Sequence, residues 1–481
     1  MERLNKIGKL KYYSASEVQD SRLGIGFEKL DRNVFDPEKA YDKVARIGVK
    51  WVRIQSGWER TEKVKGVYDF AWLDDIVDNL LARKLRPWMC LCYGNPLYTP
   101  FAGEVFGAVG CPPINSPEAM EGWLNYVKAT VEHYKGKVDF FEIWNEPDNK
   151  FSWKHKLGDE FVEKVNSVEY AEFASATGKA IKEANPEAQV IGVALAHLNN
   201  MQHINRMMDA GMYRYLDYVS FHVYSSHDAT RDDKLQQLRN LLDVYKPDLK
   251  IIQGESGAQT RSDGNGAMKG FAWTREKQLK YLLRTLITDM HFGVYFTSYF
   301  STIDMIEALH GLRAERSSYL DYGYFGVIGA DFDEAGRATG EYTEKPSYYA
   351  LSALAALLRE NAKPIQIPRV FEELPSRRMN GSDTPGEKIK TYSFRLCNGS
   401  TAMLYWMPAD ILTSSYEGTA SVSIYGQDNS EIHIVDLRDG TVYELPENMV
   451  VDLGAGGVQL INMPVTDVPL ALIFGKVGEM Q

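Results

Sequence analysis

Cysteine is scarce in this sequence of 481 residues, and the motifs that usually give cysteine a function are missing. The four cysteines are Cys90, Cys92, Cys111 and Cys397. Cys90 and Cys92 lie two residues apart in the apolar run RPWMCLCYG, which places them on one face of a strand and argues against a bridge between them or a CxxC motif. Four cysteines in so long a chain do not make a disulfide scaffold.

Long hydrophobic runs are also missing. The longest apolar stretch, YYALSALAALL at residues 348–358, is much shorter than the roughly 20 residues that a membrane span needs. Residues 1–20, MERLNKIGKLKYYSASEVQD, contain no apolar signal core. We therefore expect no membrane partner and a cytoplasmic protein, or a secreted one if a leader has been removed.

Positive charge is in short supply, since the formal net charge is −11 and no basic stripe is present. This balance disfavours nucleic acid and anionic membranes as partners. Metal-binding patterns are absent as well: there is no HExxH motif, and the nine histidines are scattered. An enolase-type metal site would need acids at the ends of successive strands, which the third, fifth and sixth predicted strands do not supply. We expect no metal and no cofactor.

What the sequence does contain is a regular alternation of short apolar strands and amphipathic helices across residues 22–360. Eight strands, each followed by a helix and each a nearly continuous apolar run, predict a (β/α)8 TIM barrel. A doubly wound sheet would need a glycine-rich phosphate turn after the first strand, and LGIGFEKLDRN lacks the third glycine. The eight strand candidates are residues 23–28, 50–55, 86–93, 138–146, 189–196, 218–224, 250–256 and 293–301.

The pattern changes in residues 361–481, where prolines interrupt the helical rhythm and short alternating strands follow. Asn-Gly and Asp-Gly pairs separate several of these strands, which predicts an antiparallel β-sandwich domain. Residues 1–21 are too short to fold alone, and we expect them to join this sandwich. Exposed aromatic platforms are not evident in it, so we favour a structural support for the barrel over a sugar-binding module.

Two glutamates end strands of the predicted barrel, where catalytic side chains of such barrels project. The fourth strand ends in Asn145 and Glu146, within VDFFEIWNEPDN, and the seventh ends in Glu255, within GESG. Paired carboxylates fit glycoside hydrolysis, in which one acid is kept protonated and the other ionised. Glu142 precedes Glu146 by four residues and lies about 13 Å further down the strand. We interpret Glu142 as a buried acid paired with a base.

Three further polar residues surround this pair in the predicted barrel. Arg53 lies on the second strand, and His222 and Tyr224 lie on the sixth. All three could donate to Glu255 and hold it charged. Alternatives are a salt bridge inside the barrel for Arg53 and a core position for His222.

The segments EIWNEPD, FHVY and GES resemble those of the retaining glycoside hydrolases of clan A, and the chain is most similar to family 39 β-xylosidase-like enzymes. The resemblance implies that Glu146 is the general acid and base and that Glu255 is the nucleophile. It further implies that Asn145 binds the sugar 2-hydroxyl. Tyr224 and Arg53 would orient Glu255, while His222 would lie on the acceptor side or near the acid.

Several aromatic and polar residues are candidates for sugar contacts. Clan members usually stack the sugar on a tryptophan of the eighth strand, but TSYFSTID has none, so we expect Tyr299 to replace it. Each aromatic candidate is as compatible with a core position as with a sugar platform. The aromatic candidates are Trp58, Tyr93, Trp273, Tyr299 and Phe300, and the hydroxyl-binding candidates are Glu28, Gln55 and Asn95.

The sequence thus predicts a retaining glycoside hydrolase of carbohydrate metabolism that works by double displacement, most simply as an exo-acting enzyme on a β-linked glycoside. Retention predicts carboxyl groups about 5–5.5 Å apart, whereas inversion predicts about 6.5–9.5 Å. The alternatives are an endo-glycanase or transglycosidase on the same barrel, and a carbohydrate-binding pseudoenzyme. A carbohydrate is the expected partner; the sugar, its linkage and whether the chain forms a homo-oligomer stay open.

Overall fold

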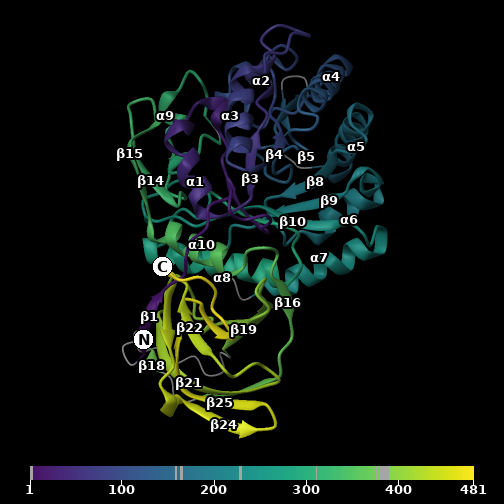
Figure 1. The fold of residues 1–481 in the computed structure, drawn as a ribbon. Coiled ribbons are helices and arrows are strands. Elements are labelled where there is room, and N and C mark those ends of the chain that lie inside the picture. The colour runs from purple at the N-terminus through teal and green to yellow at the C-terminus, as the bar shows by residue number, and fades with distance from the viewer. Residues whose placement is uncertain are drawn as a thin grey trace.

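A computed structural model describes residues 4–157, 160–162, 166–226, 230–309, 311–373, 377–378 and 389–481. It contains a barrel of strands and helices joined end to end to an all-β body, and both termini lie with the all-β body (Figure 1). Within the described residues, no helix is both long and apolar enough to cross a membrane.

Eight parallel strands close into a barrel, which confirms the predicted TIM barrel. Nearly every residue of these strands is buried, because the strands have side chains in the barrel interior on one face and helices on the other. In order around the barrel the strands are β10 (Lys250–Ser256), β11 (Thr297–Tyr299), β2 (Leu23–Gly26), β3 (Trp51–Gln55), β4 (Arg86–Leu91), β5 (Phe140–Ile143), β8 (Gln189–Leu195) and β9 (Tyr218–His222).

Eight helices cover the barrel, and several begin at side-chain caps that the sequence supplies. Ser116 accepts from the amide of Ala119 ahead of α4, and Thr274 does the same for Lys277 ahead of α8. These caps fix where each helix leaves its loop. The helices are α1 (Tyr41–Ile47), α3 (Ala71–Ala82), α4 (Pro117–His133), α5 (Ser167–Ala184), α6 (Met201–Asp209), α7 (Arg231–Tyr245), α8 (Arg275–His291) and α10 (Pro346–Leu357).

The all-β body consists of two antiparallel sheets packed around their own apolar core. β1 (Asn5–Lys9), near the N-terminus, pairs with β23 (Thr441–Glu444) at the edge of the larger sheet. The larger sheet continues with β22 (Ile432–Asp436), β26 (Leu470–Phe474), β20 (Thr401–Trp406), β19 (Lys390–Arg395) and β16 (Lys363–Ile365); the smaller contains β17 (Arg369–Glu373), β21 (Tyr416–Tyr425), β25 (Gly457–Thr466), β24 (Val450–Gly454) and β18 (Arg377–Arg378).

Helix α8 lies between the barrel and the sandwich and connects them through charged side chains (Figure 1). Lys280 pairs with Asp467 at 2.7 Å, and both side chains are buried. Arg284 donates to the backbone carbonyls of Met407, Ala409 and Asp467. The sandwich is therefore anchored on a barrel helix, away from the strand ends that carry the predicted glutamates.

Long insertions add short elements at the carboxyl end of the barrel. The segment between β11 and α10 contains β12 (Met305–Ile306), α9 (Arg316–Tyr319), β13 (Tyr322–Gly323) and a hairpin of β14 (Ile328–Phe332) and β15 (Ala338–Glu344). A single turn, α2 (Trp58–Thr61), follows β3, and the hairpin of β6 (His155–Leu157) and β7 (Glu160–Val162) follows β5.

Candidate active site

The turn after β5 brings Glu146 to the mouth of the barrel. The predicted strand 138–146 is shorter in the structure, because β5 ends at Ile143 and the backbone then takes left-handed angles, with φ 64° at Trp144 and 48° at Glu146. Such angles are uncommon in residues other than glycine and concentrate at functional sites. The buried Trp144 indole, which donates to the carbonyl of Ser152, and the Glu146 amide, which donates to Ala194, hold this turn.

Glu146 and Glu255 converge on His222. Nδ1 of His222 is 3.1 Å from a carboxylate oxygen of Glu146 and 3.8 Å from one of Glu255. One such atom from each of the three residues lies within 4.8 Å of the other two. The two carboxylates therefore meet across the barrel mouth at a distance close to the range of retaining enzymes and well below that of inverting ones.

Arg53 forms the charged floor of the site. Its side chain is 0% exposed, and it contacts Glu255 through Nη1 and Glu142 at 2.6 Å through Nη2. It also donates to Oδ1 of Asn145 at 2.8 Å and lies 3.4 Å from Glu28. The prediction that Glu142 is a buried acid paired with a base is confirmed. Arg53 thus makes both predicted contacts at once: a salt bridge inside the barrel with Glu142 and a contact with Glu255.

The surroundings of Glu255 favour its ionised form. Burial opposes ionisation, but His222, Arg53 and the hydroxyl of Tyr224, which donates at 2.8 Å, outweigh it and lower the pKa of Glu255. Burial likewise opposes a charge on His222, yet Glu255 and Glu146 raise the pKa of His222 above its usual value. The ionised form of Glu255 is thus favoured directly beside the Arg53 guanidinium.

A cavity of about 460 Å³ opens above these groups. Its size falls in the range of small-molecule sites, and aromatic and apolar residues share its wall with charged groups. Residues from at least five loops line it: Glu28, Lys29, Arg32, Gln55, Tyr93, Asn145, Glu146, Asn149, Phe151, Ala196, His197, Tyr224, Glu255, Asn265, Gly266, Ala267, Met268, Lys269, Phe300, Glu307, Leu309 and Asp321.

Glu28 stands out among the lining residues because it shares Arg53 with two other carboxylates. It is 1% exposed, and its Oε2 atom has no hydrogen-bond partner. Burial, together with the nearby charge of Glu255, raises the pKa of Glu28 to about 8 despite the opposing effect of Arg53. A neutral carboxyl at this position can both donate to and accept from a hydroxyl group.

Sequence reasoning missed five charged residues of the cavity, which are Lys29, Arg32, Lys269, Glu307 and Asp321. Lys29 pairs with Glu307 at 3.4 Å, and its ammonium lies 5.2 Å from the centroid of the Phe300 ring. Glu307 comes from the insertion after β11, which carries no strand or helix periodicity that could have placed it. Lys29 directly follows Glu28 after the first barrel strand. This position at a strand end was the signal from which its place in the site could have been predicted.

Two of the predicted sugar platforms are core residues. Trp58 is 0% exposed, stacks on Tyr98 and Tyr126, and donates from its indole nitrogen to Glu62 at 2.6 Å. Trp273 is 3% exposed and packs edge-on against Tyr281. Neither residue lines the cavity above Glu146 and Glu255, so neither is a sugar platform there, whereas Trp58 lines a second cavity beside it.

The strand-eight prediction is wrong by one residue. Tyr299 is 0% exposed and hydrogen bonds through its hydroxyl to the backbone of Ala258, so it points away from the cavity. Its neighbour Phe300, the other candidate on this strand, lines the cavity. Asn95 is also not a ligand of this cavity, because its side chain is used by the backbone of Glu62 and Leu97.

The triad of Glu146, His222 and Glu255 is also a set of side chains that divalent cations accept. Its geometry fits acid–base chemistry better than metal binding. The imidazole Nδ1 already faces Glu146, and the Arg53 guanidinium contacts Glu255 and would repel a cation placed beside it.

Comparisons with known proteins agree with this geometry. Residues 37–243 match the model of Glycosyl hydrolases family 39. A β-xylosidase of Geobacillus stearothermophilus is 26% identical over 264 residues, which are 49% of this chain and 49% of that relative. The match thus spans about half the length of the curated relative.

Solved structures share the architecture over nearly the whole chain. A family 39 glycoside hydrolase of Bacteroides cellulosilyticus WH2 has a TM-score of 0.64 at 16% identity, covering 94% of this chain and 80% of that one. A monomeric β-xylosidase of Caulobacter crescentus CB15 has a TM-score of 0.60 at 16% identity, covering 98% and 97%.

The barrel, the strand-end glutamates and these matches make the chain similar to glycoside hydrolases. Among these the chain is similar to family 39, whose model matches the barrel from α1 to α7 and includes Glu146.

Proposed function

We propose that the chain is a retaining, exo-acting β-glycosidase of the β-xylosidase type. The observation that carries this proposal is the convergence of Glu146 and Glu255 on His222 within 4.8 Å. This separation leaves no room for the water that an inverting enzyme places between its carboxyl groups and the sugar.

In the first step, Glu255 attacks the anomeric carbon while Glu146 donates its proton to the departing glycosidic oxygen. Glu255 suits this role because Arg53, Tyr224 and His222 keep it ionised. The bond from the anomeric carbon to the leaving oxygen breaks as the bond to Glu255 forms, which gives a covalent glycosyl-enzyme.

In the second step, Glu146, now a carboxylate, accepts a proton from water. The hydroxide adds to the anomeric carbon, the bond to Glu255 breaks, and the sugar leaves with its original configuration. Negative charge thus moves from Glu255 to Glu146 and back again. His222 lies near both carboxylates and can hydrogen bond to whichever is charged.

Asn145 can hydrogen bond to the sugar at the carbon next to the reacting one. Its Oδ1 accepts from Arg53, which leaves the amide nitrogen as a donor toward the cavity. We assign it the 2-hydroxyl of the sugar, a contact that strengthens in the transition state.

The β-xylosidase type is supported by the name of the Geobacillus relative, and exo action by the shape of the site. Residues 265–269 after β10 and the insertion residues Glu307, Leu309 and Asp321 join the other loops around the cavity. Loops that surround a cavity in this way can enclose one end of a substrate, whereas a long polysaccharide needs an open groove.

The test is turnover of a panel of 4-nitrophenyl glycosides by the wild type beside Glu255→Gln. We expect release of nitrophenol from the β-xyloside and its loss in Glu255→Gln. Glu118→Gln, at a surface carboxylate whose side chain is 70% exposed, is the matched control and should keep the activity. Equal turnover by wild type and Glu255→Gln would refute the assignment.

A further inference from the structure

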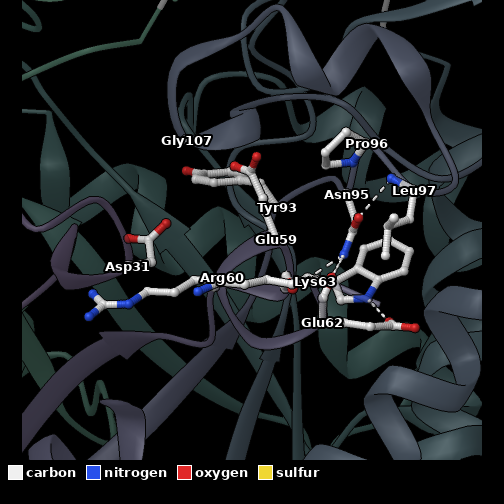
Figure 2. A pocket seen from close by; sticks show the side chains of 12 residues that line it. Asp31, Glu59, Arg60, Glu62, Lys63, Tyr93, Asn95, Pro96, Leu97 and Gly107 are labelled. Atoms are coloured by element: carbon white, nitrogen blue, oxygen red, sulfur yellow. Dashed lines mark hydrogen bonds between the residues drawn. The ribbon is translucent and has the colours of Figure 1, made fainter. Parts of the chain in front are cut away.

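A second cavity, of about 350 Å³, lies beside the first above the ends of β2, β3 and β4. Figure 2 shows its lining, which comes mainly from α2 and from the loops after these strands. Its lining residues are Asp31, Gly57, Trp58, Glu59, Arg60, Glu62, Lys63, Tyr93, Asn95, Pro96, Leu97 and Gly107.

Tyr93 is the wall that the two cavities share. It follows β4, is 3% exposed, and packs edge-on against Trp144, which precedes the Asn145–Glu146 pair. From the catalytic side, the Arg32 guanidinium lies over its ring at 5.5 Å from the centroid, and the Gln55 amide lies 3.5 Å from its hydroxyl. A ligand that spans both cavities would pass this ring.

Most charges around the second cavity already have partners, so the cavity does not favour a charged ligand. Glu62 accepts from the indole of Trp58 and the hydroxyl of Tyr98, and Glu59 pairs with Arg313. A neutral ligand matches such a site better than an anion or a cation.

One polar atom on the cavity wall has no hydrogen-bond partner. Asp31 lines the cavity with a side chain only 6% exposed; its Oδ1 forms an ion pair with Nε of Arg32 at 3.5 Å but accepts no hydrogen bond. Buried acceptors in native proteins are normally satisfied by protein, water or ligand. A carboxylate acceptor beside an aromatic ring and the apolar side chains of Pro96 and Leu97 is the combination that a sugar ring uses, with hydroxyls on its edge and C–H groups on its faces.

The barrel order indicates which part of the substrate would reach this cavity. The general acid Glu146 follows β5, and Ala196 and His197 line the catalytic cavity beyond it, after β8. The leaving group departs beside the acid, toward these residues. The second cavity lies over β2 to β4, on the opposite side of β5, and therefore on the side of the sugar that becomes bound to Glu255.

We propose that the second cavity is a subsite for a second sugar attached to the glycone, so that the enzyme releases a disaccharide from the non-reducing end. This inference rests on the proposed function and deepens it: the β-xylosidase type then applies to the bond that is cleaved, and the enzyme prefers glycosides of a disaccharide to those of a single sugar. The bond broken is that between the disaccharide's anomeric carbon and the leaving oxygen; water supplies a proton to the leaving alcohol and a hydroxyl to the disaccharide.

The test compares 4-nitrophenyl β-xyloside with 4-nitrophenyl β-xylobioside and identifies the sugar released. We expect kcat/KM to be about tenfold or more higher for the xylobioside, since one productive subsite contact of ~1.4 kcal/mol corresponds to tenfold. Intact xylobiose should appear together with nitrophenol, without free xylose. Release of xylose before nitrophenol would overturn the inference and leave the proposed function standing, whereas no turnover of either glycoside would overturn both.

Two variants test whether the preference for the xylobioside depends on the second cavity. Leu97→Trp fills the cavity and should reduce the ratio of the two kcat/KM values to near one, and Asp31→Asn, which keeps the shape, should lower it in part. Val244→Trp adds the same bulk on α7, where Val244 is 78% exposed, and should keep the ratio. A ratio unchanged by both cavity variants would overturn the inference. Calorimetry of xylobiose binding to Glu255→Gln, with and without Leu97→Trp, gives the same comparison without turnover.

Discussion

Nδ1 of His222 lies 3.1 Å from Oε1 of Glu146. The same nitrogen is 3.8 Å from Glu255, so one imidazole touches both carboxylates that exchange charge in a double displacement. Its pKa is raised by these neighbours, and it contributes to the low pKa of Glu255. In the mechanism that we propose, His222 is therefore a positioning residue for both steps.

Replacing His222 should move the pH dependence of the reaction. The pKa of Glu255 is lowered in the folded protein, and the nucleophile must be ionised, so activity is lost as the pH falls through that pKa. His222→Gln removes one of the groups that lower the pKa of Glu255, which should move the acid limb of kcat/KM to higher pH and lower kcat. The measurement is the pH profile beside that of His133→Gln, a histidine paired with Asp74 on the protein surface, whose acid limb should not move. An unmoved acid limb in His222→Gln would contradict this role.

Loss of the general acid should depend on the leaving group. Glu146→Gln should lower kcat/KM by about 10²–10⁴-fold for alkyl glycosides and oligosaccharides, which need a proton on the leaving oxygen. Dinitrophenyl glycosides need little protonation and should lose much less. Rates for a series of leaving groups of rising pKa measure this, and an equal loss across the series would show that Glu146 is not the acid.

Glu28 should make the protein less stable as the pH rises. Its folded pKa of about 8 lies above the unfolded value near 4.5, so between these values the unfolded chain has released a proton that the folded protein still holds. The free energy of unfolding then falls with pH, by at most ~1.4 kcal/mol per pH unit from this one group. Glu28→Gln should remove this slope and be more stable than the wild type at pH 8, with little difference at pH 4.5. Urea unfolding at both pH values tests it, and a Glu28→Gln variant less stable at pH 8 would refute it.

The contact of α8 with the sandwich should be a major source of stability. Arg284→Met removes the guanidinium that donates to the carbonyls of Ala409 and Asp467 and shares the Met407 carbonyl with the Ala409 amide, and we expect a loss of about 3–5 kcal/mol in the free energy of unfolding. Lys128→Met breaks an exposed pair with Glu183 and should cost less than about 1 kcal/mol. Similar unfolding curves for the two variants would show that the sandwich is not held by this residue.

Features carried by strand periodicity were predictable from the sequence. The eight apolar runs gave the barrel, and polar residues at their carboxyl ends had to meet at one mouth, which placed Glu146 and Glu255 together. Arg53 and Glu142 followed from alternation along their strands, because inward residues of neighbouring strands face each other.

Features decided by loops were not predictable in the same way. Trp58 begins a short helical turn that directs its ring toward Tyr126 of α4, so an aromatic residue at a strand end became core. Tyr299 and Phe300 are adjacent on the eighth strand, and adjacent residues of a strand point to opposite faces. An error of one residue therefore exchanges a core position for a cavity position. Glu307 comes from an insertion without periodicity, and only the folded structure places it beside Lys29.

The most direct test of the account is to trap the covalent intermediate. A 2-deoxy-2-fluoro-β-xyloside with a dinitrophenyl leaving group slows both steps but still allows the first, so the glycosyl-enzyme should accumulate; where the second cavity requires it, the corresponding xylobioside is used. Mass spectrometry of the digested protein should then find one fluorinated glycosyl group attached to Glu255, which is a xylosyl group from the xyloside or a xylobiosyl group from the xylobioside. A label on another residue, or turnover with inversion of the anomeric centre and no label, would contradict the central claim that Glu255 is the nucleophile of a retaining enzyme.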